Sequence, residues 1–389
     1  MFDDTTLSRA GTNSEENFGI LNPPVYRAST IHFPTIEAFD KRFENRFDEV
    51  VYGSYGTPTT KALESAVAEL ERASRALVLP SGTAAITLSF MATVEAGDHI
   101  MVTDSAYKST RTLCETLLRR LGVETTYFRP DAGAEIESAM RPETKLVFLE
   151  SPGSYTFEIQ DIPAITAVCR RRGILTAIDN TWASPLYFKP LEHGVDISTQ
   201  AATKYLCGHS DVMLGTIAVN DEELFRTLKD TATQFGNSVS PADCYLALRG
   251  MRTMGVRLRQ HQETATRLVE WLAGRDEVAD VLYPAWPEDP GHEIWKRDFL
   301  GASGLFGFVL KSAGKEAVAA LVEGMKYFRI GASWGGYESL MIPAYPVRSF
   351  AAPPWEDRGP LLRVHAGLED ARDLIADLET GFARLNAAR

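Results

Sequence analysis

Hydrophobic residues fall into short runs along most of the chain, and two periodicities alternate. Continuous runs rich in β-branched residues predict buried strands, and apolar residues at every third or fourth position predict helices. The predicted strands are 76–79, 99–102, 123–128, 146–149, 174–178, 197–200 and 213–219. The predicted helices are 58–73, 82–94, 110–121, 135–140 and 162–172. This alternation predicts an α/β fold with a mainly parallel seven-stranded sheet covered by helices on both faces.

The pattern changes on both sides of this region. Residues 1–56 mix Gly, Pro and short β-prone pieces around one amphipathic segment at 36–47, which predicts an N-terminal arm that contacts the body or a neighbouring subunit. After residue 250 a long helical pattern is kinked near Gly250 and Gly255. Short strands and Gly-rich loops follow it, which is typical of a smaller α+β domain. We therefore predict an arm at 1–56, an α/β domain at 57–250 and an α+β domain at 251–389.

Charge and cysteine content exclude several classes of protein. The 389 residues carry a formal net charge of −12, so no basic footprint for nucleic acid or for an anionic membrane is present. No apolar run approaches the roughly 20 residues of a membrane span, and the acidic start lacks a signal-peptide pattern. The four cysteines are far apart without metal-site spacing, which predicts buried reduced thiols, no metal site and a cytoplasmic protein.

Two charged residues follow neighbouring strands at the centre of the predicted sheet. Asp179 ends the strand at 174–178, and Lys204 follows the strand at 197–200. Open α/β sheets bind ligands at the carboxyl ends of their strands. An Asp that pairs with a pyridinium nitrogen and a Lys that forms a Schiff base are what pyridoxal phosphate chemistry requires of a protein. Alone, an Asp at a strand end is more often a turn former, and a Lys is more often a solvated charge. A cofactor site is therefore indicated only if further cofactor-binding residues accompany the pair.

Two candidates for such residues occur earlier in the same region. Ser81-Gly82-Thr83 lies between a predicted strand and a helix, where backbone N–H groups can bind phosphate. Tyr107 follows the next strand, and its ring could stack on a flat cofactor. Each is weak evidence alone, because Gly at such a turn often serves chain geometry and Tyr often covers a core edge. No G-x-G-x-x-G or G-x-x-x-x-G-K-[ST] motif is present, which argues against dinucleotide and nucleotide sites.

Three further candidates lie outside the predicted sheet. Tyr52, in the N-terminal arm, could reach a phosphate across a subunit boundary or could simply pack at an interface. The segment 333–340 contains Gly335-Gly336, which permits close approach of backbone to a ligand. Arg363 lies in an apolar, strand-like run, where a buried guanidinium requires an anion. That anion is either a substrate α-carboxylate or an internal carboxylate, and the sequence favours neither.

These residues together resemble the trans-sulfuration family of pyridoxal phosphate enzymes, the Cys/Met-metabolism group. The resemblance covers nearly the whole chain, and the segment 201–211, AATKYLCGHSD, is similar to the family's Schiff-base segment. It implies fold type I of pyridoxal phosphate enzymes and a homotetramer built from active dimers. The segment from Ser333 and Trp334 to Leu340 resembles the β-lyase version of its motif. The resemblance therefore implies β-elimination of L-cystathionine to homocysteine, pyruvate and ammonia.

The resemblance also implies a role for each candidate residue. Lys204 would hold the cofactor and act as catalytic base, while Asp179 would pair with the ring nitrogen. Tyr107 would stack on the ring and assist proton transfer. The remaining roles would be phosphate binding by Gly82, Thr83, Thr203 and, from the neighbouring subunit, Tyr52, and substrate binding by Arg363, Ser333 and Trp334.

The sequence departs from the family pattern at two positions. Ser54 stands where the family commonly has an Arg, and Ala201 stands where it has a Ser. Two phosphate-binding groups are thus absent, one of them a full charge, which bears on cofactor affinity and on the fit of the distal end of the substrate.

Other functions remain open from the sequence. Within the family they are a broader cysteine-S-conjugate β-lyase or cysteine desulfhydrase, and a γ-lyase, although Trp334 favours β-elimination. Outside it they are a NAD-dependent oxidoreductase, which the missing glycine fingerprint disfavours, and a non-catalytic protein on the same fold. Presence of both Lys204 and Asp179 argues against the last.

Overall fold

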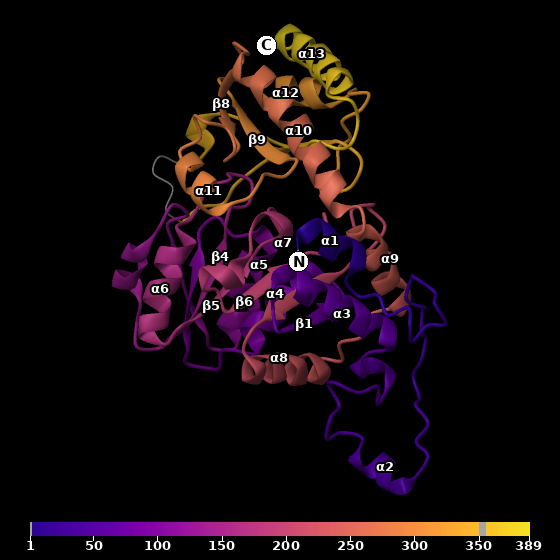
Figure 1. Ribbon diagram of the computed structural model, residues 1–389. Helices are drawn as coiled ribbons and strands as arrows, with labels where there is room; N and C mark the ends of the chain where they lie inside the picture. Colours follow the sequence, from indigo (N-terminus) through magenta and orange to yellow (C-terminus); the bar gives the residue numbers. More distant parts are fainter. Residues whose placement is uncertain (1, 350–354) are drawn as a thin grey trace.

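Seven strands form one sheet at the centre of the larger part of the molecule (Figure 1). The computed structural model describes residues 2–349 and 355–389. The strands are β1 (Arg75–Leu79), β2 (His99–Thr103), β3 (Glu124–Phe128), β4 (Thr144–Glu150), β5 (Leu175–Asp179), β6 (Ile197–Gln200) and β7 (Gly215–Val219). Their order is β1-β7-β6-β5-β4-β2-β3, and β7 runs antiparallel to both of its neighbours. The other pairings are parallel, so the predicted sheet is confirmed.

Both faces of this sheet are covered, which explains why its strands have continuous apolar runs. In β1, Ala76 and Val78 pack into one hydrophobic cluster, and Leu77 and Leu79 pack into the other. Successive side chains of a strand point to opposite faces, so each face needs its own apolar residues. The helices of this part are α3 (Pro58–Glu71), α4 (Gly82–Met91), α5 (Lys108–Leu113), α6 (Ile162–Arg172), α7 (Ser184–Tyr187), α8 (Glu222–Gln234) and α9 (Pro241–Met251).

The smaller part contains an antiparallel sheet of order β10-β11-β9-β8. Its strands are β8 (Val278–Leu282), β9 (Leu305–Leu310), β10 (Leu340–Ala344) and β11 (Leu361–His365). Its helices are α10 (Met254–Ala273), α11 (His292–Asp298), α12 (Lys315–Val322) and α13 (Ala371–Ala387). The predicted kink separates α9 from α10 at residues 252–253. Gly250 is required there for packing, because a Cβ at this position would lie 2.3 Å from the carbonyl oxygen of Cys207.

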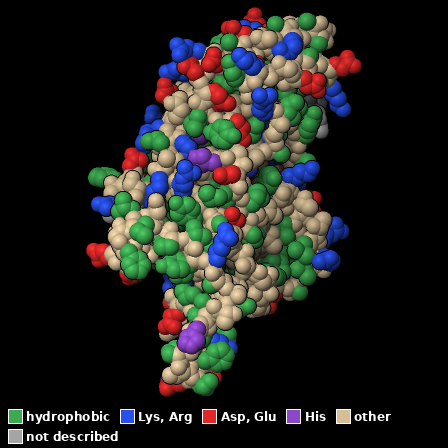
Figure 2. Space-filling model, turned by 90° about the vertical axis from the view of Figure 1, so that its right-hand side faces the viewer, with side chains coloured by type: hydrophobic (Ala, Val, Ile, Leu, Met, Phe, Trp, Pro, Cys, Tyr) green, Lys and Arg blue, Asp and Glu red, His purple; other side chains and the backbone are tan. Residues whose placement is uncertain are grey.

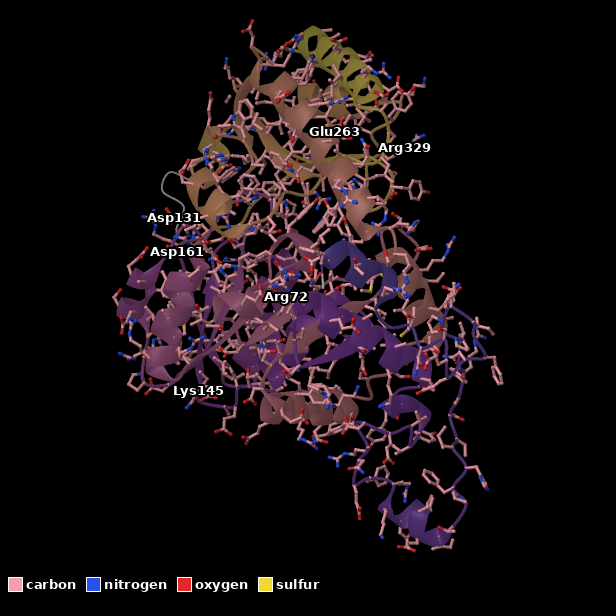
Figure 3. The ribbon with its side chains drawn as sticks, viewed as in Figure 1. Arg72, Asp131, Lys145, Asp161, Glu263 and Arg329 are labelled. Atoms are coloured by element: carbon pink, nitrogen blue, oxygen red, sulfur yellow. The ribbon has the colours of Figure 1, made fainter. Side chains whose placement is uncertain are left out.

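Contacts join the larger and the smaller part of the molecule near the carboxyl ends of the strands of the large sheet. Asp161, labelled in Figure 3, accepts a hydrogen bond from the backbone N–H of Ala164 at the start of α6 and pairs with Arg297 of α11 at 2.8 Å. The indole Nε1 of Trp182 donates to the carbonyl oxygen of Leu305 in β9 at 2.8 Å. These contacts place β9 and its neighbours next to the carboxyl ends of β4 and β5.

The N-terminal segment behaves partly as predicted. Its first residues form α1 (Asp3–Arg9), which the sequence analysis missed and which buries Leu7 against the body. The amphipathic segment at 36–47 forms a short helix over its first half, α2 (Ile36–Lys41), which lies on a projection away from the body (Figures 1 and 2). The β-prone pieces at 25–33 form no strand. Apolar side chains on this segment stay exposed, including Phe18 at 99%.

All four cysteines are buried and unpaired, as predicted. Within residues 2–349 and 355–389, no group of His, Cys, Asp and Glu is arranged to hold a metal ion. No helix in the same ranges has the length and apolar character needed to cross a membrane.

Candidate active site

A cavity of about 310 Å³ lies at the carboxyl ends of β4, β5 and β6, beside the smaller domain. Its size and its mainly apolar walls with a few charged groups are typical of small-molecule sites. The predicted site residues that line it are Gly82, Thr83, Tyr107, Asp179, Thr203, Lys204, Ser333, Trp334 and Arg363. Segments more than 280 positions apart in sequence therefore meet at one place.

Asp179 is the last residue of β5 and lies at the floor of the cavity. Its Oδ1 accepts hydrogen bonds from the backbone N–H and the hydroxyl of Thr181, at 3.0 and 2.5 Å. Its Oδ2 has no hydrogen-bond partner within the described ranges. Burial raises the pKa of this carboxyl, and the bonds from Thr181 and the charge of Lys204 oppose that shift. One carboxylate oxygen is thus fixed by the protein, and the other is available to a ligand.

Lys204 follows β6 and points to the loop that precedes β10. Its Nζ donates to Ser333 Oγ at 2.7 Å and lies 5.2 Å from the ring centroid of Trp334. Burial, followed by the charge of Arg363, lowers the pKa of Lys204 to about 8. Gly335 packs directly on this lysine with φ +84°, and a Cβ there would lie 3.0 Å from the Lys204 backbone. Only glycine fits this contact without displacing Lys204.

The start of α4 provides an anion-binding end to the cavity. Ser81 caps the helix by accepting a hydrogen bond from the N–H of Ala84 at 3.1 Å. The N–H groups of Gly82 and Thr83 have no protein partner in the described chain. A Cβ on Gly82 would lie 2.5 Å from the Cβ of Ala201. The two small residues thus let the helix end approach β6 closely. The hydroxyl of Thr203 is held by Leu214, to whose carbonyl oxygen it donates at 3.1 Å.

Arg363 lies in β11 and lines the same cavity. Its Nη2 donates to the carbonyl oxygens of Ala332 and Ser333, at 2.9 and 3.1 Å. No carboxylate pairs with it in the part of the chain that the structure describes, so the internal ion pair left open by the sequence is not found there. Burial lowers the pKa of Arg363, and the phenols of Tyr155 and Tyr107 oppose the shift. The guanidinium remains available for an anion in the cavity.

These groups fit pyridoxal phosphate. The open oxygen of Asp179 suits a protonated pyridine nitrogen, and the helix end at Gly82 suits a phosphate. Lys204 lies within the same cavity. Tyr107 precedes α5, is 41% exposed and is held by a bond from its backbone N–H to Glu150 Oε2 at 2.7 Å. Its position in the wall is compatible with stacking on a ring.

Tyr52 is not part of this cavity. It precedes the short 3₁₀ turn Gly53–Tyr55 of the arm and is 47% exposed. Its role across a subunit boundary therefore stays a prediction. The cavity wall has only two basic side chains among its described residues, Lys204 and Arg363, so the helix end at Gly82 has no cation from this chain beside it.

Glu150 and Tyr155 also line the cavity, and the sequence analysis did not single them out. Glu150, at the end of β4, is adjacent to Asp179 in the sheet register, and burial with that neighbouring charge raises its pKa well above the ordinary value. Its place one residue beyond the predicted strand 146–149 was an available signal. Tyr155 follows in a turn whose backbone conformation gives no pattern in the sequence.

Comparisons with known proteins show which family the chain belongs to. Residues 4–383 match the model of the Cys/Met metabolism PLP-dependent enzyme family. A putative cystathionine beta-lyase of Rhizobium johnstonii is 49% identical over 98% of this chain and 96% of its own. Cystathionine beta-lyase MetC of Escherichia coli is 44% identical over 98% of both chains. A crystal structure of cystathionine gamma synthase from Xanthomonas oryzae pv. oryzae in complex with cystathionine superposes with a TM-score of 0.91, at 32% identity and over 100% of both chains.

The match covers nearly the whole chain, and the relatives are similar over their full length. The chain belongs to the Cys/Met metabolism family of pyridoxal phosphate-dependent enzymes.

Proposed function

We propose that this protein is a carbon–sulfur lyase that cleaves L-cystathionine by β-elimination to homocysteine, pyruvate and ammonia, a step of methionine biosynthesis and trans-sulfuration. The observation that carries the proposal is one cavity with Asp179, Lys204 and Arg363 in a chain whose full-length relatives include named cystathionine beta-lyases. Pyridoxal phosphate, when bound, supplies a ring that accepts the electron pair of a substrate carbanion.

The residues of the chain supply binding and proton transfer. Arg363 pairs with the α-carboxylate through the Nη1 and Nε donors that its backbone contacts leave free. Lys204 Nζ takes the proton from the substrate Cα, because a pKa of about 8 leaves part of this amine neutral near pH 7. The bond between Cβ and sulfur then breaks, and its electron pair leaves with the homocysteine thiolate. The remaining three-carbon enamine is hydrolysed to pyruvate and ammonia.

Orientation of these groups comes from their immediate partners. Asp179, fixed by Thr181, keeps a negative charge for the pyridine nitrogen. Ser333 accepts the hydrogen bond of Lys204 and so directs its Nζ into the cavity. Tyr107 and Trp334 form the aromatic walls on which a planar cofactor and the substrate sulfur can pack. Gly82, Thr83 and Thr203 belong to the phosphate end.

The active unit proposed here is a homo-oligomer. Exposed apolar side chains of the arm, Phe18 and Leu21 among them, require a partner surface, and a second copy of the chain would bring Tyr52 to the phosphate end. We propose a homotetramer of active dimers, with the arm at 1–56 and domains at 57–250 and 251–389. Light scattering of the active enzyme tests this, and a fully active monomer contradicts it.

The substrate is tested by pyruvate release on protein loaded with pyridoxal phosphate. L-Cystathionine is expected to give the highest kcat/KM among L-cystathionine, L-cystine and L-methionine. A higher value for L-cystine would shift the assignment to a broader cysteine-S-conjugate β-lyase. No pyruvate from any of the three would contradict the proposal.

The pH dependence of cofactor uptake tests the state of Lys204. Only the neutral amine attacks an aldehyde, and a pKa of about 8 makes roughly one amine in ten neutral at pH 7. For an ordinary lysine, with a pKa of about 10.4, the fraction is roughly one in 2,500. The rate at which the stripped protein takes up pyridoxal phosphate, followed by absorbance, is expected to rise about tenfold per pH unit below pH 8 and to level off above it. A rate that still rises steeply above pH 9 would show an unshifted amine.

A further inference from the structure

One turn in the cavity wall has an unusual backbone. Residues 151–158 connect β4 to the segment before α6, and both Tyr155 (φ +66°) and Phe157 (φ +59°) adopt left-handed conformations. Aromatic side chains rarely occur there, because the Cβ crowds the backbone. Such outliers persist where the surrounding structure fixes them, and they are concentrated at functional sites.

Several contacts fix this turn. The N–H of Ser154 donates to the carbonyl oxygen of Ser105 at 2.8 Å, and the N–H of Phe157 donates to that of Gly153 at 3.0 Å. Arg348, from the smaller domain, donates to Thr156 Oγ1 and to both carboxylate oxygens of Glu158. Phe157 is buried in the core. Contacts from Ser105, after β2, and from Arg348, in the smaller domain, therefore fix the position of Tyr155.

Tyr155 itself is half-buried. It packs against the hydrophobic core and also lines the cavity. Its ring centroid lies 5.7 Å from the guanidinium carbon of Arg363. Its hydroxyl makes no hydrogen bond with any residue that the structure describes. A phenol held beside a buried guanidinium, with a free donor, is suited to an anion bound by that guanidinium.

We propose that Tyr155 is a second substrate-carboxylate residue: its hydroxyl donates a hydrogen bond to the α-carboxylate that Arg363 pairs with. This inference rests on the proposed function only in that the ligand is an α-amino acid. Nη2 of Arg363 is committed to backbone carbonyls. A carboxylate has about four acceptor positions, and the Nη1 and Nε donors that these contacts leave on Arg363 do not fill all of them. Tyr155 fills a further one.

The test uses binding rather than turnover. L-Alanine has the α-amine and α-carboxylate of the substrate but no β leaving group, and L-alaninamide lacks the carboxylate charge. In the holoenzyme, followed by cofactor absorbance, Tyr155→Phe is expected to raise the Kd for L-alanine about tenfold, the usual effect of losing a hydrogen bond to a charged group. The Kd for L-alaninamide is expected to stay within about twofold, because the carboxylate contact is absent from it.

The controls separate this role from packing. Tyr345→Phe, an exposed tyrosine outside the cavity, is expected to leave both constants unchanged. Tyr155→Phe should also raise the KM for the sulfur amino acid that is cleaved while kcat changes little. Wild-type affinity of Tyr155→Phe for L-alanine, or equal weakening of both probes, would overturn the proposal. L-Alanine binding does not depend on which C–S bond is cleaved, so failure of cystathionine cleavage leaves this test intact.

Discussion

Replacing Lys204 with alanine is expected to lower kcat for C–S cleavage by about 10⁴-fold or more, because a positioned general base alone contributes 10²–10⁴-fold. The same change removes the amine that attaches the cofactor, so the two losses combine. The Ser333 hydroxyl and the ring of Trp334 then lose their partner, but neither can accept a proton from Cα at neutral pH. The measurement is pyruvate release from L-cystathionine under saturating substrate and cofactor.

The matched control is Lys145→Ala. Lys145 is exposed near the amino end of β4, at the edge of the sheet opposite the cavity (Figure 3). This variant is expected to retain wild-type kcat, since surface substitutions away from special features change little. A Lys204→Ala protein that keeps more than about a hundredth of wild-type activity would assign the base to another group.

Replacing Asp179 with asparagine is expected to lower kcat by about 10²–10³-fold, the range found when one preorganised electrostatic group is removed. The change preserves shape, because the amide oxygen can still accept both hydrogen bonds from Thr181. It replaces the open carboxylate oxygen with an amide N–H₂, which is a donor and cannot pair with a protonated pyridine nitrogen. The loss thus reports on charge rather than on folding.

The comparison variant for this effect is Asp131→Asn. Asp131 is exposed and paired with Arg129, outside the cavity. The kcat of Asp131→Asn is expected to equal that of the wild type. The far-ultraviolet circular dichroism of Asp131→Asn and Asp179→Asn should both match that of the wild type. Near-normal turnover by Asp179→Asn would show that the ring nitrogen does not require a negative partner at this site.

The sequence predicted the position of Asp179 and Lys204 because parallel strands bring their carboxyl ends to one edge. Arg363 could be singled out because a charge in an apolar strand is unusual, and the structure leaves it without an ionic partner in the described chain. In each case the hydrophobic pattern predicted the strand, and a charged residue at the end of the strand, just after it or within it predicted the site.

Other features depend on contacts that no local pattern reports. The helix α1 has few apolar residues, and Leu7 is buried only because the distant helices α3 and α10 provide a surface. Strand β10 contains Pro343 and follows a Gly-rich loop, both of which argue against a strand in sequence. Tyr155 lines the cavity through a left-handed backbone that Ser105 and Arg348 impose from far along the chain. The predicted contact of Tyr52 with the phosphate lies across a subunit boundary, so a single chain cannot show it.

The identity of the products from L-cystathionine tests β-elimination most directly. The enzyme loaded with pyridoxal phosphate is incubated with L-cystathionine, and the products are identified by NMR. We expect homocysteine and pyruvate in equal amounts, with loss of the bond between sulfur and the three-carbon unit. Cysteine and 2-oxobutyrate in their place would show γ-elimination and would contradict the account.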